Sequence, residues 1–214
     1  MGTVIADLSI SLDGYAAGPE QSREEPLGKG GEALHEWALR LASWRRSHGY
    51  EGGATGPDDD VIAAREDRDG AVVMGRNMFG GHPGPWGEPA WEGWWGEEPP
   101  FHVPVFVLTH HPREPLEMKG GTTFTFVTDG IASALEQAQA AAGERHVLVA
   151  GGASTVDQAL AAGLVDELHL HVAPVLLGAG ERLFATLGDK RPRLELVETS
   201  GSSHVSHLRY RVVR

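Results

Sequence analysis

The chain has 214 residues, with 18 basic and 30 acidic side chains and a formal net charge of -12 at pH 7 when histidine is neutral. This negative charge argues against general binding to nucleic acid or to anionic membranes. The absence of cysteine from the sequence excludes disulfides, zinc sites with thiolate ligands and cysteine nucleophiles.

The length and the hydropathy of the chain suit a single α/β domain, 1–214, without an internal repeat. The sequence does not open on a basic segment followed by a long apolar run, and 18 apolar residues occur together nowhere in it. We therefore expect a cytoplasmic protein without a membrane partner.

The first part of the chain is expected to form a strand and two helices. Residues 3–12 alternate apolar with polar side chains, which is the period of a strand. In the segment 30–47 the apolar residues are spaced by three and four, which predicts one face of a helix. A second helix is expected over 61–69. Long loops are expected at about 14–30, 48–60 and 80–102.

The rest of the chain alternates strands with helices. Strands that alternate with helices predict parallel pairing with right-handed crossovers, and a closing hairpin adds an antiparallel edge. We therefore predict an α/β fold with a mostly parallel central sheet. The expected strands are 71–74, 103–109, 122–128, 147–150, 165–172, 194–198 and 204–213, and the expected helices are 131–142 and a segment that follows Gly152 and ends at Gly163.

The stretch around the strand 147–150 is the strongest candidate for a ligand site. Its four small apolar residues predict a strand buried on both faces, and Gly151 and Gly152 end it. Thr155 and Gln158 then have the spacing of a capping box at the start of a helix. A helix N-terminus behind a glycine turn presents backbone N–H groups to an anion, most often a phosphate. The alternative is an ordinary connection that happens to use two glycines.

Two other strand ends carry residues that suit a phosphorylated ligand. The strand 71–74 is followed by Gly75 and Arg76, and a planar guanidinium suits bidentate binding of phosphate. Thr109 and His110 follow a third strand. Ligands of such sheets bind at the carboxyl ends of the strands. We therefore expect these ends to share one long, multiply charged ligand such as a dinucleotide.

The segment 80–100 is too irregular for regular secondary structure and too aromatic for a solvated linker. One interpretation is a lid over a flat ring, with Trp86 as a substrate contact. The other is that its tryptophans cover the core or a subunit interface. These tryptophans are Trp86, Trp91, Trp94 and Trp95.

Four short motifs in a fixed order point to a family. They are Ser11-Leu12-Asp13-Gly14, Met74-Gly75-Arg76, Val107-Leu108-Thr109 and Gly151-Gly152-Ala153-Ser154. The chain resembles the dihydrofolate reductase-like superfamily, most closely the branch that contains the reductase domain of bacterial riboflavin biosynthesis, to which 164–168 and 178–184 are also similar. The resemblance implies a three-layer α/β/α fold with a mostly parallel central sheet and an antiparallel C-terminal hairpin.

The resemblance also implies an NADPH-dependent reductase, usually a homodimer, that transfers a hydride to a small heterocyclic or carbonyl substrate. Asp13 would face the substrate as the catalytic residue, to orient it or relay a proton, although an Asp-Gly pair also suits a simple turn. The cofactor phosphates would be held by Gly75, Arg76 and Asn77, the ribose 2′-phosphate would lie by Thr109 and His110, and the pyrophosphate would be wrapped by Gly151, Gly152, Ala153, Ser154 and Thr155.

Several alternatives stay open. Hydride transfer needs no protein nucleophile, so few catalytic residues are expected. A 5-amino-6-(5-phosphoribosylamino)uracil reductase would need a basic site for a ribose phosphate, and a dihydrofolate reductase proper would need a carboxylate such as Glu32 or Glu36. A non-catalytic nicotinamide-dinucleotide-binding protein is an alternative of another class. No metal is expected, because His169 and His171 share a strand face without a nearby acidic third ligand.

Overall fold

The computed structural model describes residues 2–65, 68–80, 84–87 and 90–213. Its strands are β1 (Val4–Ser11), β2 (Tyr15–Ala17), β3 (Asp69–Gly75), β4 (Pro104–Leu108), β5 (Leu116–Glu117), β6 (Thr123–Val127), β7 (His146–Gly151), β8 (Glu167–Ala173), β9 (Glu181–Arg182), β10 (Arg193–Gly201) and β11 (Ser206–Val213). Its helices are η1 (Gly31–Leu34), α1 (Glu36–Leu39), α2 (Ala42–Ser47), α3 (Pro57–Ala63), α4 (Arg76–Phe79), η2 (Lys119–Gly121), α5 (Ile131–Ala142) and α6 (Ala153–Ala161).

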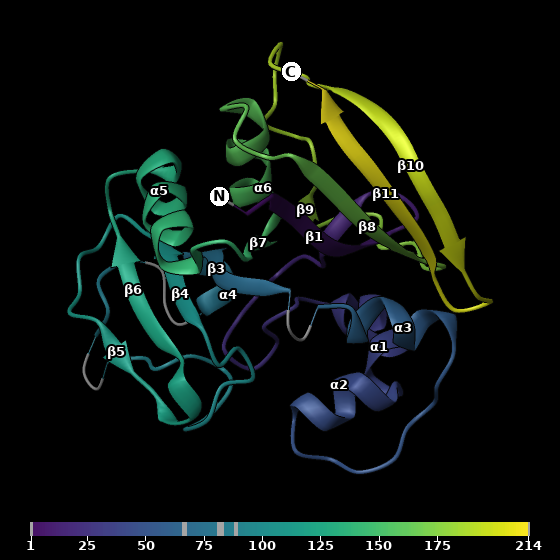
Figure 1. Ribbon diagram of the computed structural model, residues 1–214, viewed down its shortest axis with the longest axis horizontal. Coiled ribbons are helices and arrows are strands. Elements are labelled where there is room, and N and C mark those ends of the chain that lie inside the picture. Colours follow the sequence, from purple (N-terminus) through teal and green to yellow (C-terminus); the bar gives the residue numbers. More distant parts are fainter. Residues whose placement is uncertain (1, 66–67, 81–83, 88–89, 214) are drawn as a thin grey trace.

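Nine strands of the described chain form one sheet in the order β10-β11-β8-β1-β7-β3-β4-β6-β5 (Figure 1). All pairs from β8 to β6 are parallel, and the outer pairs β10–β11, β11–β8 and β5–β6 are antiparallel. The predicted α/β fold with a mostly parallel sheet and an antiparallel C-terminal hairpin is confirmed. Strands β2 and β9 form a separate small sheet.

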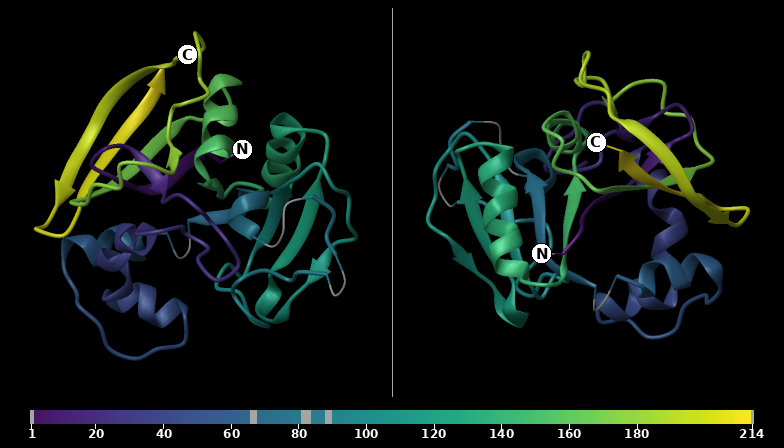
Figure 2. Two further views of the ribbon diagram at one scale, coloured as in Figure 1. Left: turned by 180° about the vertical axis from the view of Figure 1, so that it is seen from behind. Right: turned by 45° about the horizontal axis from the view of Figure 1, so that its top comes forward.

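Helices cover both faces of the sheet. Helices α5 and α6 pack on β3 and β7 on one face, as Figures 1 and 2 show. There they bury Val4, Ala6 and Leu8 of β1 in the main core. The other face of β1 carries Asp7 and Ser9 and meets the segment of short helices η1 to α3. The described part of the chain has no helix of the length and hydropathy that a membrane span needs.

The single helix predicted over 30–47 is wrong. The chain forms the three short helices η1, α1 and α2 instead. The helical path breaks at Leu41, whose backbone is extended with ψ at 145° and forms a β-bridge with Ala54. The apolar spacing still predicts the buried residues correctly, because Leu34, Trp37 and Leu41 are all buried.

Helix α3 begins at Pro57, four residues before the predicted start at 61. Proline suits the first position of a helix, and carboxylates in the first turn suit its dipole. Residues 66–67 of the predicted helix lie outside the described residues. The first-turn carboxylates are Asp58, Asp59 and Asp60.

The aromatic loop, which we define as residues 84–87 and 90–101, builds a second core on the sheet. Trp86, Trp91 and Trp95 pack against a cluster that includes the buried Phe79 and Phe124. The ring centroids of Trp86 and Phe79 are 5.7 Å apart, and the rings meet edge to face. Most of these tryptophans therefore cover core residues. Residues 81–83 and 88–89 of the predicted loop lie outside the described residues.

Candidate active site

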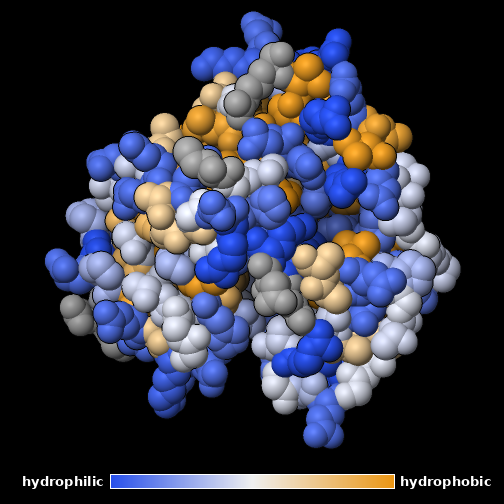
Figure 3. Space-filling model, in the orientation of Figure 1, coloured by the Kyte–Doolittle hydropathy of each residue, from blue (hydrophilic) through white to orange (hydrophobic). Residues whose placement is uncertain are grey.

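A cavity of about 890 Å³ lies over the strand ends on the face of the sheet opposite α5 and α6. Figure 3 shows the surface hollowed between the part that carries β4 to β6 and the part that carries α1 to α3. This volume lies in the usual range for small-molecule and cofactor sites. All ten residues predicted to bind the cofactor line it: Gly75, Arg76, Asn77, Thr109, His110, Gly151, Gly152, Ala153, Ser154 and Thr155.

Strand β7 and helix α6 form the turn predicted at the two glycines. Strand β7 is not buried on both faces as predicted, because Leu148 and Ala150 are only partly buried and look into the cavity. Thr155 does not cap the helix. The N-cap is Gly152, which a cis peptide bond joins to Gly151. The N–H of Thr155 donates to the carbonyl of Gly152 at 3.0 Å. The helix therefore starts one turn closer to the strand and brings its N-terminus to the cavity wall.

Gly75 permits the close approach of β3 to α6. A Cβ atom at this position would lie 2.4 Å from Oγ1 of Thr155, nearer than side chains can pack. Because the backbone of Gly75 has φ at -83° and ψ at 160°, the need for glycine comes from space and not from backbone strain. Gly75 and Thr155 are thus adjacent walls of one site.

Arg76 opens α4 and is held in place by two contacts. Its guanidinium carbon lies 3.7 Å from the centroid of the Trp86 ring, and Nη1 donates to the carbonyl of Gly80. The guanidinium carbon of Arg113 lies 5.1 Å from the same ring. Burial, followed by the charge of Arg113, lowers the pKa of Arg76. Arginine stays protonated under such conditions, so two positive charges stand beside the predicted phosphate site.

Thr109 and His110 form a tight turn directly after β4. The N–H of Thr109 donates to the carbonyl of Val127 at 3.0 Å, and its Oγ1 accepts from the N–H of His111 at 3.2 Å. This turn leaves the His110 side chain exposed at the cavity.

The two predicted substrate contacts, Asp13 and Trp86, are not among the residues that line the cavity. The carboxylate of Asp13 accepts from the N–H groups of Leu177 at 3.1 Å and Gly178 at 2.7 Å. A hydrogen bond from Ser11, helped by these two N–H groups, lowers the pKa of Asp13 to about 2. Asp13 is thus ionised and tied to the loop after β8. Its substrate role stays a prediction, and so does that of Trp86, which reaches the cavity through Arg76.

The structure adds a polar cluster to the cavity wall, and of its members only His171 was a candidate from the sequence, as a metal ligand. It comes from β1, from the η1–α1 junction, from the turn after α3 and from β8. The cavity-lining members of this polar cluster are Asp7, Ser9, His35, Trp37, Arg65 and His171. Polar residues on β1 were predicted as the second face of a strand, yet every residue of β1 is buried. The available signal was that a central strand of a parallel sheet has no solvent face.

Asp7 is the charged centre of the polar cluster. Its Oδ1 lies 2.5 Å from Nη2 of Arg65 and 2.8 Å from Nε2 of His171. Burial alone would raise the pKa of Asp7, but the charge of Arg65 and the hydrogen bonds from His169 and His171 outweigh it and hold the pKa well below its usual range. Asp7 is therefore an ionised carboxylate next to an imidazole at the cavity wall.

His171 continues the polar cluster away from the cavity. Its Nδ1 lies 2.7 Å from Nδ1 of His207 on β11, and Nε2 of His207 lies 3.2 Å from Oδ1 of Asp58 on α3. Burial, partly offset by the neighbouring carboxylates, lowers the pKa of both histidines. The ring of Trp37 lies 5.1 Å from each of the two imidazoles.

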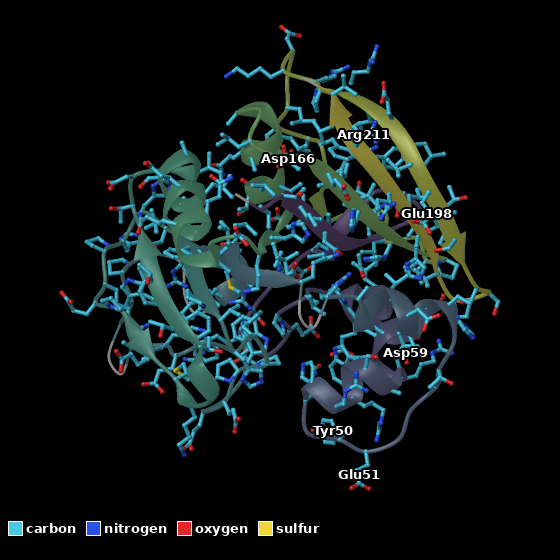
Figure 4. The ribbon with its side chains drawn as sticks, viewed as in Figure 1. Tyr50, Glu51, Asp59, Asp166, Glu198 and Arg211 are labelled. Atoms are coloured by element: carbon cyan, nitrogen blue, oxygen red, sulfur yellow. The ribbon has the colours of Figure 1, made fainter. Side chains whose placement is uncertain are left out.

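The short helices that cover the polar cluster are tied together by carboxylates. Asp59 on α3 accepts from the N–H of Ser43 on α2 at 2.8 Å, and Figure 4 places it within the helical segment. Ser202, in the turn of the C-terminal hairpin, donates to Oδ2 of Asp58 at 2.6 Å. Helix α3 thus connects the hairpin to the cavity wall.

His169 does not join His171 in a metal site. Nε2 of His169 lies 2.9 Å from a carboxylate oxygen of Glu167, and its Nδ1 lies 3.6 Å from Oδ2 of Asp7. Within the described ranges, no three histidine, aspartate or glutamate side chains are grouped so that they could hold a metal ion.

Comparisons with known proteins agree on one fold. A family model described as the RibD C-terminal domain matches residues 2–207. A riboflavin biosynthesis protein from Shewanella sp. PV-4 is similar over the full length of both chains, with 21% identity and a TM-score of 0.64. Dihydrofolate reductase from Enterococcus faecalis is similar over 99% of this chain and 96% of its own, with 14% identity and a TM-score of 0.52. The predicted dihydrofolate reductase-like fold is confirmed.

A third similar structure is a larger protein. It is a diaminohydroxyphosphoribosylaminopyrimidine deaminase/5-amino-6-(5-phosphoribosylamino)uracil reductase from Thermotoga maritima, with 15% identity and a TM-score of 0.58. The match covers 99% of this chain but 57% of that protein, so the chain spans little more than half of the bifunctional enzyme. A search among curated proteins found no match.

Proposed function

The chain belongs to the family of RibD C-terminal domains, and from this premise we propose that it is an NADPH-dependent oxidoreductase that transfers a hydride to a small heterocyclic or carbonyl substrate. The observation that carries the proposal is the convergence of ten residues, from the ends of β3, β4 and β7, on one cavity. Separate strand ends that supply backbone N–H groups, a guanidinium and an imidazole suit a ligand with several charged groups.

The cavity wall offers a path for an extended dinucleotide. The N-terminus of α6 would take the pyrophosphate, since the first N–H groups of a helix lack partners within it. Arg76 and Arg113, both gathered on the Trp86 ring, would supply positive charge in a chain whose net charge is -12. Thr109 and His110 would lie beside the ribose 2′-phosphate.

The substrate would occupy the part of the cavity beside the polar cluster. Bound NADPH supplies the hydride, so the protein has to orient the acceptor, exclude water and provide a proton. Trp37, Trp94 and Trp95 line the cavity and offer flat apolar surfaces for a ring. Asp7, Arg65 and His171 offer charge and hydrogen bonds in the same cavity.

The lining residues favour a substrate without a phosphate. Arg65 and Arg76 are the arginines among the described lining residues, and no lysine is among them. Arg65 is engaged by Asp7, and we assign Arg76 to the cofactor. The carboxylates considered for a folate, Glu32 and Glu36, are exposed and absent from the lining. An unphosphorylated ring or carbonyl compound therefore suits the cavity better than a ribose phosphate.

We also propose that the protein is a homodimer. Strand β10 is an exposed edge strand of nine residues. It exposes Leu194, Leu196 and Val197, at 37%, 58% and 41% of their surface. A long edge strand with exposed apolar side chains suits pairing with another chain. Sedimentation analysis of the wild type and of Leu196→Glu tests this: a dimer that the substitution dissociates supports the proposal, and a wild-type monomer contradicts it.

Calorimetry with NADPH and NADH, followed by a turnover assay, tests the proposed activity. We expect NADPH to bind more tightly than NADH, and Arg76→Ala to weaken NADPH about tenfold, the loss of one charge-assisted phosphate contact. Arg191→Ala, a substitution of an exposed arginine, is the matched control. Loss of the reduced-nicotinamide absorbance with a panel of heterocyclic and carbonyl acceptors then reports turnover. Tight NADPH binding without turnover of any acceptor would favour the non-catalytic alternative.

A further inference from the structure

A chain of hydrogen-bonded titratable groups leads from α3 to the cavity wall. Asp58 contacts His207 at 3.2 Å, His207 contacts His171 at 2.7 Å, and His171 contacts Asp7 at 2.8 Å. The exposed fractions of these four residues are 8%, 5%, 3% and 5%. Arg65 closes the cavity end, because its Nη2 is 2.6 Å from Nε2 of His171.

The geometry allows one arrangement of protons when both histidines are neutral. Asp58 accepts only, so Nε2 of His207 must carry a proton and its Nδ1 must accept. Nδ1 of His171 then donates to Nδ1 of His207. This leaves Nε2 of His171 as an acceptor, and Arg65 donates to it. Each contact of the two imidazoles then joins a donor to an acceptor, except the contact between Nε2 of His171 and Oδ1 of Asp7, which joins two acceptors.

One added proton permits the reverse arrangement, which keeps the extra positive charge away from Arg65, whose Nη2 is 2.6 Å from Nε2 of His171. His207 then carries protons on both nitrogens and donates to Asp58 and to Nδ1 of His171. Nε2 of His171 carries a proton and donates to Oδ1 of Asp7 at 2.8 Å, and Nη2 of Arg65, which can no longer donate to Nε2, keeps Oδ1 of Asp7 as its acceptor. The extra positive charge lies on His207, and the transferable proton lies one imidazole away, at the cavity wall.

Burial lowers the pKa of both His171 and His207; the carboxylates around the two imidazoles oppose this effect for one proton but not for a second. Asp7 and Asp58 bring two negative charges and Arg65 one positive charge, so a single proton makes the group neutral. Arg68, at 3.9 Å from Oδ2 of Asp7, is paired with Asp69 at 2.8 Å and adds no net charge.

His35, which also lies near the His171–His207 pair, adds no positive charge to it. Burial, with the positive charge of Arg65, lowers the pKa of His35 to about 4, so His35 is neutral above this pH. His169 is paired with Glu167. The second proton would therefore place an uncompensated charge in a buried site.

We propose that His171 is the proton donor to the substrate and that His207, held by Asp58, stores the proton that His171 delivers. This inference rests on the proposed function. Bound NADPH would supply a hydride to one atom of the substrate double bond, and the other atom would take the proton from Nε2 of His171 in the same step as Nδ1 of His171 takes the Nδ1 proton of His207. The products are the reduced substrate, NADP⁺ and two neutral imidazoles, and one proton from water recharges the pair after the product leaves.

Histidine side-chain ¹H–¹⁵N spectra of the ligand-free protein test the store without a cofactor or a substrate. At high pH we expect the Nδ1–H tautomer of His171 and the Nε2–H tautomer of His207. On acidification the pair should take up one proton in a shared transition. Asp58→Asn, which removes the charge and keeps the shape, should move this transition at least one pH unit lower. Independent titrations, or an unchanged transition in Asp58→Asn, would overturn the proposal.

Kinetics test the delivery of the proton. His171→Gln and His207→Gln should lower kcat about 100-fold, in the range of general acid catalysis, with NADPH affinity by calorimetry unchanged. Asp58→Asn should shift the pH profile of kcat to lower pH by the same amount as the transition in the spectra. His204→Gln, on the exposed hairpin turn, is the matched control. A protein that shows the shared transition but binds no NADPH would refute the proposed function and leave the proton store standing. Equal pH profiles for Asp58→Asn and wild type would refute the delivery.

Discussion

The close contact between β3 and α6 predicts that Gly75→Ala destabilises the wild-type protein but stabilises a Thr155→Ala variant. Gly75→Ala would bring a Cβ within 2.4 Å of Oγ1 of Thr155, which is 4% exposed. Overpacking of this kind costs about 1–3 kcal/mol. The backbone of Gly75 suits alanine, so without the clash the same substitution should stabilise the protein by about 0.4–1 kcal/mol through the unfolded state.

We therefore expect opposite effects in two backgrounds. In the wild type, the clash of Gly75→Ala should lower Tm by about 2–12 °C, less the smaller stabilising effect through the unfolded state, at about 2–4 °C per kcal/mol for a chain of this size. In a Thr155→Ala background the clash is gone, and Gly75→Ala should raise Tm by about 1–4 °C by the same conversion. Calorimetry with NADPH should show weakened binding for the single variant Gly75→Ala, because relief of the clash moves the start of α6.

Differential scanning calorimetry on the four proteins of the cycle measures the coupling. A rise in Tm for Gly75→Ala in the wild-type background would show that β3 and α6 are not in contact there. Equal effects in both backgrounds would show that Thr155 is not the neighbour that excludes a side chain. Either result would refute the close packing that we assign to this wall of the cavity.

Three further predictions concern Trp86, Asp157 and His35. Trp86→Leu should weaken NADPH binding about fivefold, because the contact between the ring and the guanidinium of Arg76, at 3.7 Å, contributes about 1 kcal/mol to the binding free energy. An unchanged affinity by calorimetry would show that Trp86 does not support the cofactor site. Asp157→Ala should lower Tm by about 4–12 °C. The carboxylate is 1% exposed and accepts from the N–H groups of Phe184 and Thr186, and the loss of these hydrogen bonds costs about 2–3 kcal/mol. A smaller change would mean that water replaces the carboxylate. Burial lowers the pKa of His35 to about 4, so the folded state keeps this side chain neutral where the unfolded state would protonate it. The stability of the protein should therefore be unaffected by His35 above about pH 6.5 and should fall as the pH decreases toward 4. His35→Gln should flatten the curve of Tm against pH in this range, and parallel curves for the two proteins would contradict the prediction.

Much of the sheet and of the cofactor wall could be predicted because the signals are local. Helix α5 spans Ile131–Ala142 as predicted, since its content of Ala, Glu and Gln and the Gly143 that follows lie within one short segment. Gly75, Arg76 and Gly151 stand directly after apolar strands, and parallel strands place their carboxyl ends at one edge. Those two facts predict six of the cavity-lining residues, Gly75, Arg76, Thr109, His110, Gly151 and Gly152, and the family resemblance implied the other four, Asn77, Ala153, Ser154 and Thr155.

The parts that failed depend on contacts between distant segments. The helix predicted over 30–47 breaks because Leu41 pairs with Ala54, which no periodicity reports. The proton-bearing pair joins residues 36 positions apart, and its partner Asp7 lies 164 positions from His171. Alternation on β1 and β8 showed that these side chains share a face, but only the sheet order shows that the face is buried.

A crystal structure of the protein with bound NADP⁺ tests most directly whether the cavity is a dinucleotide site. We expect the pyrophosphate at the N-terminus of α6, the ribose 2′-phosphate beside Thr109 and His110, and the nicotinamide ring facing the polar cluster. A dinucleotide bound elsewhere on the protein, or a cavity that stays empty at saturating NADP⁺, would contradict the proposed function.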